Sequence, residues 1–111
     1  MEQVTSVKNY FDTLPQRFKP EAAKGVKATY QFELSAPDAA TYHVNVDDGK
    51  LTIVEGPAAT ANATIKMKGE DYVKMANGKL SGTMAFLKGQ MKIAGDMMAA
   101  RKMEQLFPPT K

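Results

Sequence analysis

The fold is decided by residues 28–55, ATYQFELSAPDAATYHVNVDDGKLTIVE. Apolar and polar residues alternate over Ala28–Leu34 and again over Tyr42–Asp47, and a period of two is typical of half-buried β-strands. Asp48-Gly49 is a strong signal for a tight hairpin, and a third alternating run, Lys50–Glu55, follows it. The connections are too short for a parallel crossover, so these strands are predicted to form an antiparallel meander.

An apolar stripe with helical spacing precedes this meander. Its members recur every three or four residues and are Val4, Val7, Phe11, Leu14 and Phe18. Because a proline inside a helix removes a backbone hydrogen bond, Pro15 is expected to end or kink this helix near Leu14. A single helical turn is predicted over Pro20–Gly25, with proline at its start and glycine just past its end.

The pattern changes after residue 63, where short helices are mixed with strands. The predicted elements are strands Ala63–Met67 and Gln90–Ala94 and helices Glu70–Ala76, Ser81–Leu87 and Met97–Leu106. Asp96 is predicted to cap the last helix, because its carboxylate meets free backbone N–H groups and the positive end of the helix dipole. Pro108-Pro109 is expected to end that helix.

These elements indicate an α+β domain of two layers. We expect a five-stranded mixed, mostly antiparallel sheet with helices covering one face and solvent on the other. The link between the fourth and fifth strands, residues 68–89, is long enough to make the crossover that a mixed sheet needs. A length of 111 residues corresponds to one domain spanning residues 1–111.

Composition excludes several classes of protein. The chain has no cysteine and a single histidine, His43, which excludes disulfides, thiolate-bound metals and a histidine-rich metal site. The longest apolar runs, Met84–Leu87 and Met97–Ala100, are far shorter than the roughly 20 residues of a membrane-spanning helix. Met1–Asn9 does not resemble a signal peptide. We therefore expect a cytoplasmic protein without cofactor or metal.

Basic residues are concentrated in the second half of the chain. The net charge is +3, but residues 1–63 carry −2 and residues 64–111 carry +5. Thirteen of the fifteen cations are lysine rather than arginine. This argues against nucleic acid as a partner, because proteins that recognise bases rely on bidentate hydrogen bonds from the arginine guanidinium. The alternatives left open are a lysine-rich solvated face and transient contact with an anionic membrane.

No catalytic motif is visible in the sequence. Phosphate-binding glycine loops, a nucleophile elbow and zinc-protease spacing are absent. The adjacent carboxylates Asp47-Asp48 and Glu70-Asp71 are explained by a hairpin turn and a helix start. His43 falls on the predicted polar face of its strand. We therefore expect a protein that is not an enzyme.

Methionine is concentrated near the C-terminus. The last part of the chain contains Met84, Met91, Met97, Met98 and Met103. Methionine is unbranched and polarisable, so it adapts its shape to variable partners, whereas a tightly packed core usually favours branched residues. This composition fits either an ordinary core that uses methionine as filler or an adaptable apolar cavity, and the residues alone do not choose between them.

Several of these segments together resemble the sterol carrier protein type-2 domain, the nonspecific lipid-transfer domain family. The resemblance is carried by Ala63–Met67, Glu70–Met75, Gly78-Lys79-Leu80, Phe86-Leu87 and, above all, Gly89-Gln90-Met91-Lys92-Ile93-Ala94-Gly95-Asp96-Met97. Leu14-Pro15-Gln16-Arg17-Phe18 and Tyr30-Gln31-Phe32 also resemble the family. The similarity covers essentially the whole chain.

The resemblance implies a noncatalytic domain with a hydrophobic tunnel between sheet and helices, closed at one end by the C-terminal helix. Its ligands would be fatty acids, fatty acyl-CoA, sterols or phospholipids, bound with low specificity. The residues that correspond to the lipid-binding walls are Phe32, Met84, Phe86, Leu87, Met91, Ile93, Met97, Met98 and Leu106. Many members carry glutamine where this chain has Lys88, and Lys88 would pair with an anionic headgroup.

Two other functions remain open on the sequence. One is a noncatalytic interaction or accessory module on the same scaffold, with the cavity filled by side chains. The other is a small isomerase or hydrolase, which would need a buried carboxylate facing the pocket. Glu33 and Asp47 are the strand candidates for that carboxylate, and both fall on the predicted solvent face.

Overall fold

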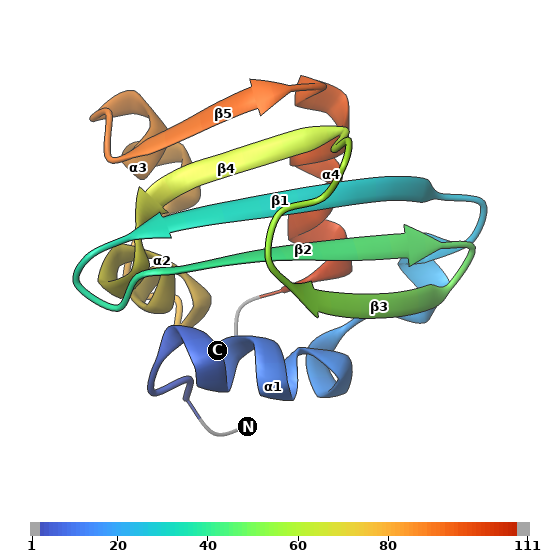
Figure 1. Cartoon of the computed structure of the whole chain (residues 1–111), viewed down its shortest axis with the longest axis horizontal. Coiled ribbons are helices and arrows are strands. Elements are labelled where there is room, and N and C mark those ends of the chain that lie inside the picture. The colour runs from blue at the N-terminus through green and yellow to red at the C-terminus, as the bar shows by residue number, and fades with distance from the viewer. Residues whose placement is uncertain (1–2, 109–111) are drawn as a thin grey trace.

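The computed structural model describes residues 3–108 and forms a five-stranded sheet with four α-helices (Figure 1). The strands are β1 (Lys27–Ser35), β2 (Ala40–Asp47), β3 (Lys50–Glu55), β4 (Ala63–Lys68) and β5 (Met91–Gly95). The helices are α1 (Val7–Arg17), the 3-10 turn Pro20–Ala23, α2 (Gly69–Ala76), α3 (Gly82–Leu87) and α4 (Met97–Leu106). The predicted α+β class and mixed sheet are confirmed.

The predicted meander of β1, β2 and β3 is confirmed. Val44 of β2 lies opposite Tyr30 of β1 and Ile53 of β3 in antiparallel register. Tyr30, Phe32 and Val44 are fully buried, whereas the residues between them in the sequence are more exposed. The alternation in the sequence therefore corresponds to burial of one face of the sheet.

The predicted position of the crossover is wrong. The strand order is β3-β2-β1-β4-β5, β4 is parallel to β1, and β5 is antiparallel to β4. The crossover is thus the short link of residues 56–62 between β3 and β4. It is held on β1 by backbone and side-chain hydrogen bonds between Asn62 and Thr29, of 2.8 and 2.7 Å, and by the Ala58 N–H donating to Gln31 Oε1. Seven residues suffice because an extended chain covers up to about 3.5 Å per residue.

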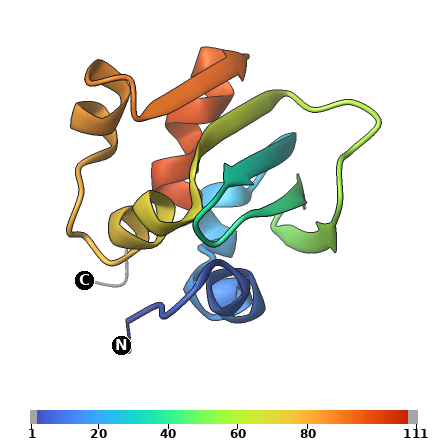
Figure 2. The same cartoon turned by 60° about the vertical axis from the view of Figure 1, so that its left-hand side comes forward.

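The crossover loop and the helices lie on opposite faces of the sheet. In Figure 1 the loop passes in front of β1 and β2, and α2, α3 and α4 lie behind the sheet. Figure 2 shows the same separation after rotation, with the loop on one side and the helices on the other. The prediction that helices cover one face is confirmed. On the other face, His43 Nδ1 lies 2.9 Å from the Gly56 carbonyl oxygen, so this histidine helps to hold the loop.

Helix α1 continues to Arg17, so the prediction that Pro15 ends it near Leu14 is wrong. The predicted apolar stripe explains the difference, because Leu14 is fully buried and Phe18, just beyond the helix, is 9% exposed. Burial of these side chains outweighs the one backbone hydrogen bond that proline removes. The end of the helix is closed by the Phe18 N–H, which donates to the Leu14 carbonyl.

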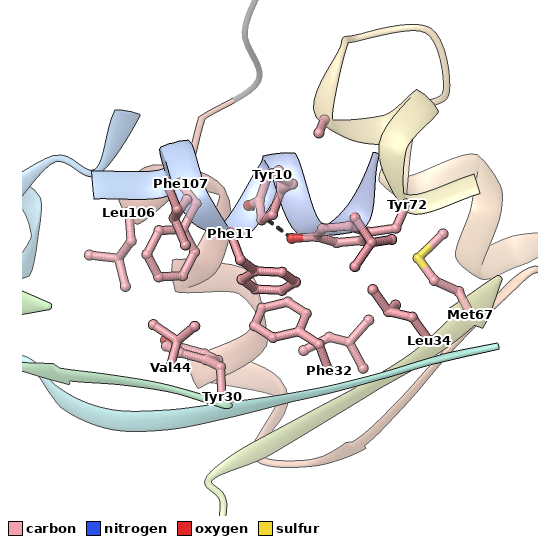
Figure 3. Close-up of a cluster of buried hydrophobic side chains, with 14 of the residues drawn as sticks. Tyr10, Phe11, Tyr30, Phe32, Leu34, Val44, Met67, Tyr72, Leu106 and Phe107 are labelled. Carbon is pink, nitrogen blue, oxygen red and sulfur yellow. Dashed lines mark hydrogen bonds between the residues drawn. The ribbon is translucent and has the colours of Figure 1, made fainter. Parts of the chain in front are cut away.

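Aromatic side chains fill the space between α1 and the sheet (Figure 3). Phe11 stacks on Tyr42 with ring centroids 4.1 Å apart, and it meets Phe32 edge to face at 5.3 Å. Tyr72 of α2 packs against Phe32 and Tyr10. This part of the layer between helices and sheet is therefore solidly packed.

The predicted cap of α4 by Asp96 is confirmed, and α3 is capped in the same way by Ser81. The Ser81 hydroxyl accepts from the Met84 N–H at 3.3 Å, and the Asp96 carboxylate accepts from Met98 N–H at 2.9 Å. Helix α4 ends at Leu106, and of the proline pair expected to stop it Pro109 lies outside the described residues. Between residues 3 and 108, no helix has the length and apolar character needed to cross a bilayer.

Candidate functional site

An apolar cavity of about 240 Å³ lies beneath β5, between α3 and α4. Its wall contains residues from α2, α3, α4, β4 and β5 and is dominated by aliphatic, aromatic and thioether groups. The lining residues are Ile65, Met75, Gly82, Thr83, Phe86, Met91, Ile93, Met97, Ala100, Arg101 and Met103. The alternation along β5 places Met91 and Ile93 in this wall, while Lys92 and Ala94 between and after them are exposed.

A second cavity of about 450 Å³ lies between α1, α2 and the end of α4. It is bordered by the segment that joins α2 to α3. The lining residues are Tyr10, Tyr72, Met75, Ala76, Gly78, Lys79, Leu80, Ser81, Gly82, Met103, Phe107 and Pro108. Its volume falls within the roughly 300–1,000 Å³ of small-molecule sites.

The two cavities adjoin. Met75 of α2, Gly82 of α3 and Met103 of α4 belong to the wall of both. Two of these three shared residues are methionines, whose three rotatable bonds let the side chain take up several shapes. Two of the three residues at the boundary can therefore change shape by side-chain rotation, without a change of backbone.

Helix α3 has two apolar faces. Gly82, Thr83 and Phe86 share one face by their spacing of three and four residues and line the smaller cavity. Met84 and Leu87, three residues apart, form the other face and are 46% and 71% exposed. A helix that is apolar on its outer face has a surface that water solvates poorly.

Helix α4 is anchored at one end and exposed at the other. Leu106 is fully buried and Phe107 is 8% exposed, and Phe107 packs against Phe18 and Tyr30. Met97 and Met98, at the start of the helix, are 46% and 74% exposed. The structure thus fixes the C-terminal end of α4 in the core and leaves its N-terminal end at the rim of the smaller cavity.

The ten residues proposed from the sequence fall in three places. Phe86, Met91, Ile93 and Met97 line the smaller cavity. Phe32 and Leu106 are fully buried in the core and lie in the wall of neither cavity. The remaining four, Met84, Leu87, Lys88 and Met98, are exposed beyond the cavity walls.

Sequence reasoning missed most of the larger cavity. Tyr10 and Tyr72, which line it, were not proposed. Met75 and Ala100 were also missed, although each lies on the same helical face as an apolar neighbour. Such residues become recognisable only when α1, α2 and α4 are placed around one space, and their separation along the chain carries no local signal for that.

The larger cavity has polar groups in its wall. Tyr72 and Tyr10 are both 3% exposed, and the Tyr72 hydroxyl donates to the Tyr10 hydroxyl at 2.9 Å (Figure 3). Burial is the main cause that raises the pKa of Tyr10, and burial raises the pKa of Tyr72 well above 10. Both hydroxyls therefore keep their protons at neutral pH, and one of these protons is used in the hydrogen bond between them.

Arg17 lies beside this tyrosine pair. Its guanidinium sits 4.7 Å from the Tyr10 ring centroid, and the side chain is 5% exposed. It donates to Thr13 Oγ1 at 2.6 Å and to the Tyr10 carbonyl at 2.8 Å. Its Nε has no partner, and no carboxylate within the described residues pairs with it. A buried cation thus stands next to the cavity without a counter-charge.

A third cavity, of about 840 Å³, lies on the opposite face of the sheet, and most of its lining residues are polar or charged. Lys66 of β4 lies directly opposite Lys92 of β5, and Lys66 Nζ is 3.8 Å from a Glu33 carboxylate oxygen. Glu33 therefore borders a solvent-facing surface. Asp47 is exposed at the end of β2. No cluster of three or more metal-ligating side chains occurs in the part of the chain that the structure describes.

Comparison with known proteins connects this architecture to a family. The model of the SCP-2 sterol transfer family matches residues 11–108. Hydroxysteroid dehydrogenase-like protein 2 of Bos taurus is 36% identical over 103 residues, which are 92% of this chain and 25% of that protein. The chain spans about a quarter of the length of the curated relatives that it matches.

Solved structures agree with the family match. The sec-alkylsulfatase Pisa1 from Pseudomonas sp. contains a similar fold, with a TM-score of 0.81 and 21% identity over 96% of this chain and 17% of that one. The solution structure of palmitated SCP2L2 from Aedes aegypti has a TM-score of 0.73 and 20% identity and covers 91% of this chain and 93% of that one. From the family match, the chain belongs to the SCP-2 sterol transfer family.

Proposed function

We propose that this chain binds lipids noncatalytically, holding an aliphatic chain in the two adjoining cavities between α2, α3, α4 and β5. The observation that carries the proposal is the pair of cavities, of about 240 and 450 Å³, with Met75, Gly82 and Met103 in both walls. Palmitate occupies the related fold of the Aedes aegypti protein. A continuous tunnel forms in this proposal when the two methionines move aside.

The energetics of such binding are favourable. Removing apolar surface from water contributes about 25 cal/mol per Å², so burying a long aliphatic chain stabilises the complex by several kcal/mol. Methionine in the wall lowers the cost of fitting chains of different shape, which suits binding of low specificity. The exposed start of α4 and the outer face of α3 flank the smaller cavity, so a ligand has a path to it that avoids the packed aromatic core.

The same rim supports a role for an anionic membrane as the surface from which lipid is taken. Met84, Leu87 and Met98 are exposed apolar side chains on α3 and α4. Lys88 follows α3 directly and Lys102 lies one turn beyond Met98 on α4. Apolar groups beside cations match the interface of a bilayer that carries anionic headgroups.

Lipid binding can be tested by filling the smaller cavity. Ala100 lines it from α4, so Ala100→Trp should place an indole in the space that an acyl chain would use. Ala94→Trp is the matched control, because Ala94 is exposed on the opposite face of β5. We expect a fluorescent fatty acid to bind the natural chain and the control and to lose at least tenfold in affinity for Ala100→Trp.

Native mass spectrometry of gently purified protein provides an independent measurement. The proposal predicts copurified lipid in the natural chain and less in Ala100→Trp. Absence of bound lipid, together with no binding of the fluorescent probe, would favour the alternative of an accessory module whose cavities are not used by a ligand.

A further inference from the structure

The polar end of the larger cavity contains a hydrogen-bond donor that is not used. Tyr10 and Tyr72 share one hydrogen bond of 2.9 Å between their hydroxyl oxygens. One hydrogen bond between two hydroxyls consumes one of their two protons, whichever of them donates. No hydrogen bond that uses the second proton occurs among residues 3–108, and both side chains are 97% buried and line the cavity. Such a donor requires a partner, because an unsatisfied buried polar group is costly.

The charge next to this donor is positive and uncompensated. Arg17 is 95% buried, and both groups that accept its hydrogen bonds, Thr13 Oγ1 and the Tyr10 carbonyl, are neutral. Burying a cation without a counter-ion is unfavourable, and an anion brought close to it is correspondingly stabilised in the low dielectric of the interior. The guanidinium lies 4.7 Å from the Tyr10 ring centroid, and its positive charge acts on both tyrosines of the pair.

We propose that this end of the cavity receives the ionised carboxylate of a long-chain fatty acid, with the free hydroxyl proton of the Tyr10–Tyr72 pair donating to it and Arg17 supplying the compensating charge. This inference rests on the proposed lipid-binding function and specifies its ligand class. The acyl chain then extends past Met75 and Met103 toward the smaller cavity beneath β5. The domain thereby selects single-chain carboxylic acids over neutral lipids of the same length.

The orientation differs from the one that the sequence predicts. Lys88, the expected partner of an anionic headgroup, is exposed at the end of α3 and lines neither apolar cavity. An exposed lysine gains little from an ion pair, because water screens it. The tyrosine pair and Arg17 are buried, so a carboxylate there exchanges its hydration for fixed donors and charge.

The test compares palmitate with hexadecanol, which has the same chain length and no charge. We expect the natural protein to bind palmitate about tenfold or more tightly, the effect of one hydrogen bond to a charged group. The double variant Tyr10→Phe/Tyr72→Phe, which removes only the two hydroxyl oxygens, should lose this preference, because the lost hydrogen bond stabilises the charged palmitate more than the neutral hexadecanol. Tyr42→Phe is the control, since Tyr42 lines neither cavity.

A second pair of variants separates charge from hydrogen bonding. Arg17→Gln removes the charge and keeps an amide that can donate to Thr13 and the Tyr10 carbonyl, so it should lower palmitate affinity and not hexadecanol affinity. Lys88→Gln should change neither. A preference for palmitate that survives in the double tyrosine variant, or that is lost in Lys88→Gln instead, would overturn the inference.

Isotope-edited NMR of the natural protein with labelled palmitate locates the headgroup directly and does not depend on the stability of any variant. We expect contacts from the C2 protons of palmitate to the rings of Tyr10 and Tyr72, and contacts from the terminal methyl group to Phe86 or Ile93. The reverse orientation would overturn the inference and leave the proposed function intact. Binding of neither palmitate nor hexadecanol would overturn the proposed function as well.

Discussion

Met75 of α2 and Met103 of α4 are both wall residues of both apolar cavities. The capacity of the site therefore depends on two side chains rather than on the position of a helix. Because methionine changes shape by rotation about single bonds, this boundary can open without loss of backbone hydrogen bonds. Opening by side-chain rotation differs from opening by local unfolding, which would break backbone hydrogen bonds.

The first prediction concerns chain length. Met103→Phe should place a stiffer, bulkier group at the boundary and confine a ligand to one cavity, so the affinity for palmitate should fall at least fivefold while octanoate binds within about twofold of the natural protein. Fluorescent-probe displacement with fatty acids of increasing length measures this. Met98→Phe serves as control because Met98 is 74% exposed and lines neither cavity. Equal losses for both acids in Met103→Phe would show that the cavities do not cooperate.

The second prediction concerns the membrane. Leu87 is 71% exposed on the outer face of α3, so Leu87→Asp should leave stability within about 0.5 kcal/mol and weaken binding to vesicles containing anionic lipid by about tenfold. Sedimentation with vesicles measures the effect. Val54→Asp, at another exposed apolar position, on β3, should bind as the natural protein does.

The salt dependence provides a further check of that prediction. Binding of the natural protein should increase with the fraction of anionic lipid and decrease as salt is added, because cations at the rim attract the headgroups. Vesicle binding that responds to neither condition, or that is unchanged in Leu87→Asp, would contradict the role given to this surface.

The third prediction concerns the junction between the crossover loop and α4. Gly95 has a φ of +96°, and a Cβ there would clash with the Asn62 carbonyl oxygen. Gly95→Ala should therefore destabilise the fold by about 2–4 kcal/mol, through backbone strain and a clash with backbone that cannot move freely. Gly56→Ala is the matched control, since its φ is +111° and a Cβ would meet nothing within 4 Å.

Urea unfolding of both variants separates the cost of the positive φ from the cost of the clash with Asn62. Gly56→Ala should lose only the cost of the unfavourable φ, about 1 kcal/mol. The difference between the variants then measures the close approach of Gly95 to the crossover. Equal destabilisation would mean that the loop moves away without cost.

The fourth prediction concerns alkaline pH. Burial raises the pKa of Tyr10, and it raises the pKa of Tyr72 well above that of a free tyrosine, so the unfolded chain releases these protons at a lower pH than the folded one. Stability should be fully present below about pH 10 and should fall as the pH rises above that value toward the raised pKa values. Urea unfolding between pH 8 and 11 measures this.

The double variant Tyr10→Phe/Tyr72→Phe is the comparison for the pH series. It should lose less stability over the same pH interval, because the two groups that cause the linkage are gone. Lysines titrate in the same range in both proteins and cancel in the difference. A decline with pH that is as steep in the variant would assign the effect to other groups.

Much of the fold follows from local pattern. Ala28–Glu55 predicts three strands and their antiparallel order because strand alternation and the Asp48-Gly49 turn are properties of neighbouring residues. The capping of α4 by Asp96 is likewise local, since a carboxylate satisfies the free N–H groups two and three residues ahead. The resemblance to the family was visible in the Gly89–Met97 run for the same reason.

Two errors have a common physical cause. The sequence places the crossover in the long link before β5, but the short link of residues 56–62 makes it, because Asn62 and Gln31 side chains bind that loop to the sheet. Of the two outcomes that the sequence allows at Pro15, an end of α1 near Leu14 or a kink, the end is wrong, because the helix continues to Arg17 with Leu14 and Phe18 buried. In both cases contacts between distant residues outweigh a local preference.

For the candidate site, too, local sequence determines one part and contacts between distant residues determine the other. The residue types that an apolar cavity needs, and the face of β5 on which they lie, were determined by the sequence alone, because composition and periodicity are properties of consecutive residues. Which of them line a cavity was decided by tertiary structure. Phe32 lies in the core and Leu87 lies on the surface. Tyr10, Tyr72 and Arg17 lie close together at one end of a cavity, because the packing of α1 against α2 brings together residues more than fifty positions apart.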